Sequence, residues 1–317
     1  METQRPDIGP EAPRPEPEKS ALGFFAAVLA LYALLGSGAQ ALRPALGLAW
    51  TEVFVFLLPA LAAAAGSNLS PGSFLLLSRR PRLLHMAIAT GIGAALFLVA
   101  SGVMTLSTLL LPASWVERFD LTRLFLGSGA QRLAMALLAS LLAPVAEEVA
   151  FRGYILSALR TRTRPWPAIA GAAFLFAAMH LDPIRFPAVL LLGVAFGWLA
   201  WRSGSIWPAV VAHAVNNGLG SAVATSAGRD LGADADLASA LAVSAVGVAA
   251  VAPLALAFWR ATPSPPPLAE ALAPVDPLDP SIRFRLSRVP GGYRYLAAAG
   301  AALLAALAAS RHSLGPP

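Results

Sequence analysis

The feature that most constrains this chain is a succession of apolar runs, each long enough to cross or nearly cross about 30 Å of hydrocarbon. The runs lie near residues 21–42, 47–66, 83–111, 131–151, 166–181, 187–202, 206–226, 237–259 and 292–309. Hydrophobic residues make up 57% of the 317 residues and charged residues only 13%, whereas about a quarter of a soluble domain is charged. The sequence therefore predicts an all-α, polytopic membrane protein of about eight or nine transmembrane helices with an intramembrane polar cavity.

The segments outside these runs divide the chain. Residues 1–20 combine Pro and Glu without apolar periodicity, which predicts a disordered cytoplasmic tail rather than a signal peptide. Residues 21–260 are expected to form the membrane domain. Residues 261–290 predict a Pro-rich loop, and residues 291–317 a terminal helix and tail.

The positively charged residues are concentrated in the loops between the apolar runs. The formal net charge is +6, but the arginines lie in short segments between apolar runs, which argues against a nucleic-acid partner. With a cytoplasmic N-terminus, the inward-facing segments contain most of them: Arg79, Arg80, Arg82, Arg160, Arg162, Arg164, Arg202, Arg260, Arg283, Arg285, Arg288 and Arg294. This asymmetry fits the positive-inside rule. Because the composition is rich in Arg and poor in Lys, as in GC-rich genomes, we expect an integral protein of a bacterial inner membrane, surrounded by lipids.

Few side chains in the runs can do chemistry. The chain has four His residues and no Cys, which excludes disulfides, cysteine nucleophiles and thiolate metal sites. The remaining polar groups fall into three clusters in consecutive parts of the chain.

The first cluster is Leu141–Tyr154, LLAPVAEEVAFRGY, which places three charged residues in an apolar helical run. Glu148 and Arg152 are four residues apart, so they can form an ion pair on one helix face. Glu147 points about 100° away and remains a lone carboxyl in a low-dielectric setting, as suits a general base. The alternative is a structural ion pair with one spectator acid.

The second cluster is His180, at the end of the run AGAAFLFAAMH. A lone histidine in a membrane is often only an interhelical hydrogen-bonding residue. However, Glu147 precedes the basic turn at Arg160–Trp166 by about as much as His180 follows it. In an antiparallel helix pair, Glu147 and His180 are therefore expected to face each other at equal depth.

The third cluster is AHAVNN, in which His213 and Asn217 share one face of a helix. An imidazole and a carboxamide can stabilise an oxyanion or bind a water molecule, although interhelical polar contact is the alternative for either residue alone. Asn216 lies about 100° off that face and is expected to act independently. Glu52 and His85 are expected at the membrane interface, and the DP sequence at Asp182 predicts a turn.

Three motifs carry a resemblance to a known family. EEVAFR, from Glu147 to Arg152, is similar to EExxxR; FAAMH, from Phe176 to His180, to FxxxH; and HAVNN, from His213 to Asn217, to HxxxN. In this order, over roughly residues 130–220, they resemble the CPBP family of intramembrane endopeptidases, which includes the CAAX protease, bacteriocin-processing, Abi and Rce1-like proteins.

The resemblance implies hydrolysis of a peptide or a membrane-anchored protein substrate. Glu147 would activate water and His180 would orient it or move its proton, while His213 and Asn217 would stabilise the oxyanion. Glu148 and Arg152 would support the site. No cofactor is expected, because there is no HExxH sequence and Asn217 is a poor zinc ligand, and zinc-dependent hydrolysis stays the alternative mechanism.

Two functions outside proteolysis remain open. A transporter can also bury Glu, Arg and His within the membrane, but the sequence shows no inverted repeat or paired broken helices. A non-catalytic membrane immunity or scaffold protein could retain the fold without the chemistry, although all four residues implied in catalysis are present.

Overall fold

The computed structural model describes residues 17–66, 70–120, 127–227, 236–262 and 265, and this part of the chain contains helices and no strand. Six helices are long and apolar enough to cross a membrane: Ala21–Leu42, Pro44–Ala65, Leu83–Leu110, Gly129–Arg160, Phe186–Ser203 and Leu237–Ala261. The predicted all-α membrane fold is thus confirmed. The run at 292–309 lies outside the described residues, so the number of eight or nine spans stays a prediction.

Two of the predicted spans form helices outside this group of six. The helix α11 (Pro165–Met179) has 15 residues and is short for a span. The helix α13 (Trp207–Ala227) has 21 residues but contains His213, Asn216 and Asn217, which lower its hydropathy. Both helices contribute residues to the polar cluster described below.

The N-terminal part forms two antiparallel rods. The first consists of α1 (Pro17–Leu31), the π-helical η1 (Tyr32–Gly36) and α2 (Ser37–Leu42), and the second of α3 (Pro44–Thr51), the π-helical η2 (Glu52–Leu57) and α4 (Leu58–Gly66). Pro44 begins α3, because its missing N–H costs nothing in a first helical turn. Pro17 begins α1. The helix α1 therefore begins within the range 1–20 that the sequence assigned to a disordered tail, and residues 1–16 of that range lie outside the described residues.

The remaining elements follow in chain order. They are α5 (Pro71–Phe74), α6 (Leu83–Leu110), α7 (Ala113–Arg118), α8 (Gly129–Leu137), η4 (Leu138–Leu142), α9 (Ala143–Glu148), η5 (Val149–Ile155), α10 (Leu156–Arg160), α11, α12 (Phe186–Ser203), α13 and α14 (Leu237–Ala261). The elements from α8 to α10 form one long helix in which η4 and η5 are π-helical. Such widened turns often occur at functional sites.

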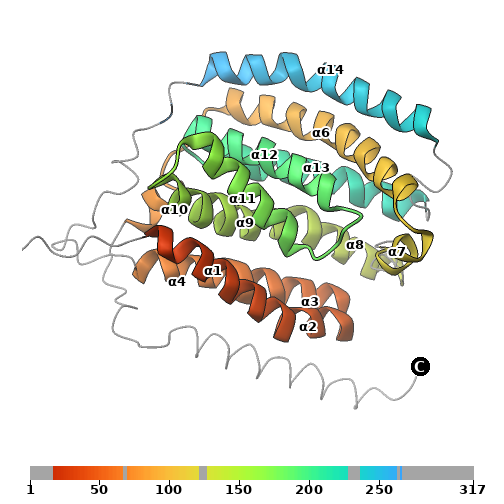
Figure 1. The fold of residues 1–317 in the computed structure, drawn as a ribbon, viewed down its shortest axis with the longest axis horizontal. Coiled ribbons are helices and arrows are strands. Elements are labelled where there is room, and N and C mark those ends of the chain that lie inside the picture. The colour runs from red at the N-terminus through yellow and green to blue at the C-terminus, as the bar shows by residue number, and fades with distance from the viewer. Residues whose placement is uncertain (1–16, 67–69, 121–126, 228–235, 263–264, 266–317) are drawn as a thin grey trace, which may run out of the picture.

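The helices pack in layers from α14, through α6, α12 and α13, to the long helix and α11, and then to α1–α4 (Figure 1). Small residues allow the closest approaches. A Cβ added at Gly247 of α14 would lie 2.6 Å from Cγ2 of Val99 on α6, and Gly93 of α6 packs directly against the backbone of Ala212 on α13. Such small-residue contacts are typical of helix packing in membranes.

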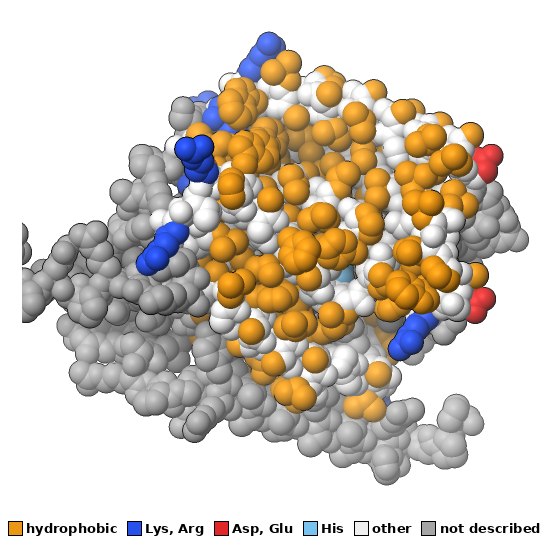
Figure 2. Space-filling view, viewed as in Figure 1, with side chains coloured by type: hydrophobic (Ala, Val, Ile, Leu, Met, Phe, Trp, Pro, Cys, Tyr) orange, Lys and Arg blue, Asp and Glu red, His pale blue; other side chains and the backbone are white. Residues whose placement is uncertain are grey.

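The outer surface is apolar. Figure 2 shows hydrophobic side chains spread over the face in view, with most visible Lys and Arg side chains at the end that lies at left. Exposed apolar residues of α14 include Leu237, Leu241, Val246 and Val248. A surface of this kind fits lipid as the solvent for the middle of the molecule.

The ends of α6, α12 and α14 meet at the Arg-rich end. Nη2 of Arg202 donates to the carbonyls of Trp259 at 2.8 Å and Thr262 at 3.0 Å, and Nε2 of His85 lies 3.0 Å from the carbonyl of Ala261. His85 is therefore at an end of the bundle but is buried. Its ring bonds to a carbonyl at the end of α14, and its position at the level of the membrane interface stays a prediction.

Candidate active site

The glutamate pair lies on α9, between the two π-helical segments. Pro144 is the second residue of α9 and has no N–H to donate. The carbonyl of Ala139, five residues earlier, therefore lacks its donor in the π register. It accepts instead from Nδ2 of Asn217 at 3.0 Å. The proline thus frees a carbonyl that joins the glutamate helix to α13.

Glu148 binds two cationic or potentially cationic side chains through one oxygen. Its Oε1 lies 2.7 Å from Nη1 of Arg152, and both side chains are fully buried. The same oxygen lies 2.9 Å from Nδ1 of His213. Because a carboxylate oxygen can only accept, Nδ1 of His213 carries the hydrogen. Glu148 therefore orients the His213 ring as well as neutralising Arg152.

Arg152 also contacts α12 and two aromatic rings. Its Nη2 donates to the carbonyl of Gly193 at 3.1 Å. Its guanidinium carbon lies 4.3 Å from the centroid of the Phe176 ring and 5.5 Å from that of Phe196, and the ring of His213 stacks on Phe196. Cation–π contact of this kind stabilises a desolvated guanidinium. The sequence indicated Phe176 only as the first residue of the FxxxH motif. No sequence pattern distinguished Phe196 from the other apolar residues.

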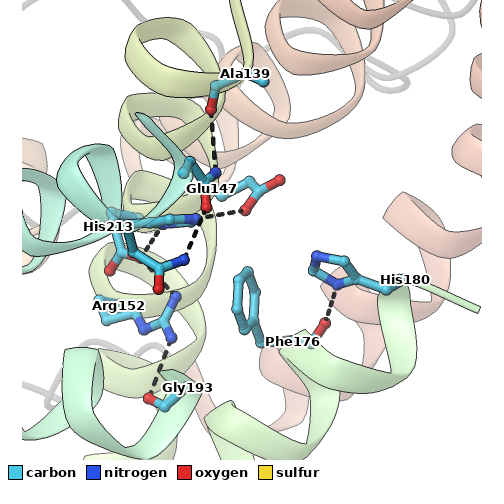
Figure 3. Close-up of polar contacts among 10 residues, drawn as sticks. Ala139, Glu147, Arg152, Phe176, His180, Gly193 and His213 are labelled. Carbon is cyan, nitrogen blue, oxygen red and sulfur yellow. Dashed lines mark hydrogen bonds and ion pairs between the residues drawn. The ribbon is translucent and has the colours of Figure 1, made fainter. Parts of the chain in front are cut away.

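Glu147 has no such set of partners. Its side chain is 14% exposed, and its Oε2 lies 3.7 Å from Nε2 of His213. In the described part of the chain, no hydrogen bond reaches this carboxylate. Figure 3 shows Glu147 beside His213, with His180 across the site. The two adjacent glutamates thus differ sharply: Glu148 is bound through Oε1 to Arg152 and His213, whereas Glu147 is available for a proton.

His180 lies at the C-terminal end of α11. Its Nδ1 is 2.9 Å from the carbonyl of Phe176. Because a carbonyl only accepts, Nδ1 carries the hydrogen and Nε2 remains an acceptor. Figure 3 shows the Phe176 ring between His180 and the groups around His213. The structure thus brings His180 to the same site as Glu147, although no hydrogen bond within the described residues joins the two.

The turn after His180 is built by Asp182. Its Oδ1 accepts from the backbone N–H groups of Ile184 at 2.9 Å and Arg185 at 3.1 Å. Its Oδ2 accepts from Nε of Arg185 at 2.7 Å. Asp182 therefore forms the turn that leads into α12, as the DP sequence predicts.

Asn217 and Asn216 form a linked pair. Nδ2 of Asn217 donates to the Ala139 carbonyl, and Nδ2 of Asn216 donates to Oδ1 of Asn217 at 3.2 Å. Asn216 therefore contacts Asn217 although it lies about 100° away around the helix, because the side chains of adjacent residues can still reach each other. His213 and Asn217 share a helix but bind different neighbours, Glu148 and Ala139.

Metal-ligand geometry is a separate question. Over residues 17–66, 70–120, 127–227 and 236–262, no three His, Cys, Asp or Glu side chains come together as a set that could bind a metal ion. His213 is bound to Glu148, and His180 binds a backbone carbonyl.

Comparison with known protein families finds a match in the region that contains these residues. No curated protein and no solved structure matches the chain. Residues 129–219, which include Glu147, Glu148, Arg152, His180, His213 and Asn217, match the family model of type II CAAX prenyl endopeptidase Rce1-like proteins, in agreement with the three motifs.

Proposed function

We propose that this protein is an intramembrane endopeptidase that hydrolyses a peptide bond near the membrane surface. Its substrate would be a peptide or a membrane-anchored protein. The observation that carries the proposal is the contrast between the two glutamates: Glu148 is paired with Arg152 and His213, whereas the one ion-pair partner of Glu147 within the described residues is Nε2 of His213, at 3.7 Å. The match of residues 129–219 supports the same class of reaction.

Glu147 acts as the general base. Its carboxylate takes a proton from a water molecule while the water oxygen attacks the carbonyl carbon of the scissile bond. The C–N bond then breaks, and Glu147 returns the proton to the leaving amine. The base is regenerated, and the sum of the steps is the addition of one water molecule across the peptide bond.

His180 positions the water. Its Nδ1 is occupied by the Phe176 carbonyl, so its Nε2 can accept a hydrogen bond from the same water molecule. With one proton directed to His180 and the other to Glu147, the lone pair of the water oxygen points toward the substrate carbonyl.

His213 and Asn217 stabilise the oxyanion. The Asn217 amide has two N–H groups, of which one donates to Ala139, leaving the second for the substrate oxygen. His213 donates from Nδ1 to Glu148, and a hydrogen on its Nε2 is directed toward the developing negative charge. Donors placed in this way lower the barrier because they bind the transition state more strongly than the substrate.

No metal ion takes part in this mechanism as proposed. The carboxylate supplies the base and the His213 and Asn217 donors supply the charge stabilisation that zinc would otherwise provide. Zinc-dependent hydrolysis stays the alternative, and the response of activity to chelation distinguishes the two. We place the N-terminus and the Arg-rich end of the bundle in the cytoplasm of a bacterium, by the positive-inside rule.

A comparison of membranes tests the activity while the substrate is still unidentified. Newly formed peptide ends are identified in cells that express the wild-type protein, Glu147→Ala or Glu117→Ala. Glu117 is an exposed acid of α7 and serves as the control. Ends that depend on the wild-type protein should vanish with Glu147→Ala and persist with Glu117→Ala. Identical sets of ends in all three samples would contradict the proposal.

A further inference from the structure

A third glutamate lies in the same part of the bundle. Glu52 begins η2, and the residue is only 2% exposed. The sequence suggested that it lies at the membrane interface, and the structure shows that the surrounding helices bury it. Its Oε2 is buried and has no hydrogen-bond partner in the described part of the protein. An ionised carboxylate without a partner is strongly disfavoured at such a position.

Glu52 lies close to the glutamate helix. The segment η2 packs against both α9 and η5, and Phe56 of η2 contacts Phe151 of η5, with ring centroids 6.1 Å apart. Among the titratable groups, Glu147 and Tyr32 lie close enough to Glu52 to interact with it electrostatically. The two carboxyls therefore belong to one local environment, although they come from different helices.

The other charged and titratable groups near Glu52 are already occupied or neutral. Among the side chains that the structure describes on the elements packed against η2, and in the neighbouring η1, they are Glu147, Glu148, Arg152, Tyr154 and Tyr32. Glu148 and Arg152 bind each other, and the Tyr154 ring packs on Phe24 and Phe74. No cation in the described residues forms an ion pair with Glu52. Among the described residues, Glu147 and the unpartnered Oε2 of Glu148 remain as anionic acceptors for a proton that Glu52 carries, and of the two it is Glu147 with which Glu52 interacts electrostatically.

We infer that Glu52 is a positioning residue of the catalytic site, and that its neutral carboxyl is hydrogen-bonded to Glu147 through one water molecule. The inference rests on the proposed function. Two adjacent carboxyls in a buried site share one proton, because two negative charges there would repel. Glu52 keeps its proton through the cycle, so the reaction remains balanced. Its hydrogen bond leaves one oxygen of Glu147 directed at the attacking water.

Three substitutions separate this role from a merely structural one. Glu52→Met removes the hydroxyl and fills the space with an apolar side chain. We expect it to lower kcat by about tenfold or more, the loss of one hydrogen bond to a charged group, while KM is unchanged and Tm is equal or higher. Glu52→Gln retains an N–H donor and should be at least about fivefold more active than Glu52→Met.

The matched control is the neighbouring Thr51→Val. Thr51 is buried, and its hydroxyl bonds to the carbonyl of Gly47 and accepts from Gln40. Thr51→Val should lower Tm and leave kcat unchanged. Glu52→Met, in contrast, should lower kcat without lowering Tm. If Glu52 had only a structural role, kcat of its variants would decrease only where Tm also decreases.

The activity probe is an internally quenched peptide that ends in a farnesylated CAAX sequence. Wild-type kcat in Glu52→Met, or equal activity of Glu52→Met and Glu52→Gln, would overturn the inference. If the wild-type protein shows no Glu147-dependent cleavage of this peptide, the result counts against the proposed function and not against the state of Glu52.

Infrared spectroscopy of the purified protein needs no substrate. The carbonyl stretch of a protonated carboxylic acid should be present in the wild-type protein and in Glu147→Gln, and should be reduced in Glu52→Gln. A band that is unchanged in Glu52→Gln would show that Glu52 does not carry the proton, and would overturn the inference whatever the activity.

Discussion

His213 donates from Nδ1 to Oε1 of Glu148 at 2.9 Å, so the second glutamate of the pair orients the imidazole whose other nitrogen lies 3.7 Å from the first. The two acids are adjacent in sequence but have different environments. Glu148 has a cationic partner on its own helix, Arg152. Glu147 has none, which leaves it free to exchange a proton with water.

Removal of the two carboxyls should therefore have different consequences. Glu147→Ala should abolish cleavage and leave stability nearly unchanged, since an unpaired buried carboxyl contributes little to folding. Glu148→Ala leaves Arg152 as an uncompensated buried charge and releases the His213 ring. We expect it to lower the free energy of unfolding by about 3–5 kcal/mol.

Thermal unfolding in detergent, together with peptide cleavage, measures both effects. Glu117→Ala on the exposed surface of α7 is the control for loss of a carboxyl as such. Equal losses of stability for Glu147→Ala and Glu148→Ala would contradict the division of roles.

Asn217 should act on the transition state. Asn217→Ala is expected to lower kcat by about a hundredfold with little change in KM, the usual cost of one oxyanion donor. Asn217→Asp should be worse, because a carboxylate repels the oxyanion. Asn216→Ala should also lower kcat, by a smaller factor, since Asn216 donates to Oδ1 of Asn217.

Thr225→Val is the appropriate control on α13, because the Thr225 hydroxyl bonds only to the backbone carbonyls of Ser221 and Ala222. It should leave kcat unchanged. A rise in KM alone for Asn217→Ala would require the oxyanion role to be withdrawn.

Gly193 is a position where the backbone itself serves the site. Its carbonyl accepts from Arg152, and an added Cβ would lie 2.9 Å from Cβ of Ala173 on α11. Gly193→Ala should therefore separate α11 from α12, lower stability by about 1–3 kcal/mol and reduce activity. Gly38→Ala, where nothing lies within 4 Å of the new atom, should be neutral or slightly stabilising. Equal effects of both substitutions in unfolding measurements would contradict this packing.

Chelation tests the metal-free mechanism. Activity should survive prolonged dialysis of the purified protein against a chelator, because Glu147 activates water without a Lewis acid. The metal content before and after dialysis is measured by mass spectrometry. Stoichiometric zinc, with activity that is lost on its removal and restored on its return, would establish the zinc-dependent alternative.

Much of the fold could be predicted because the membrane imposes simple rules. Apolar length predicts the spans, and the range 21–42 coincides with the observed helix Ala21–Leu42. The four-residue spacing predicts the ion pair of Glu148 with Arg152, which forms at 2.7 Å. Both are local properties of one helix, so the sequence contains nearly all that they require.

Contacts between side chains were harder to predict than the helices themselves. The burial of Glu52 depends on how η2 packs on α9, and the bond between Asn216 and Asn217 depends on side-chain rotamers that angular spacing does not describe. The π-helical turns that flank the glutamates also have no simple sequence pattern, although Pro144 marks one of them. These features depend on tertiary packing, which cannot be deduced from the local patterns of a single sequence.

The most direct test of the central claim is cleavage in water enriched in ¹⁸O. The quenched farnesylated CAAX peptide is incubated with purified wild-type protein, Glu147→Gln or Glu117→Ala. The masses of the products are then measured by mass spectrometry. The account predicts one ¹⁸O atom in the new carboxylate for the wild-type protein and Glu117→Ala, and no product for Glu147→Gln. Labelled product from Glu147→Gln at the wild-type rate would contradict the assignment of Glu147 as the group that activates water.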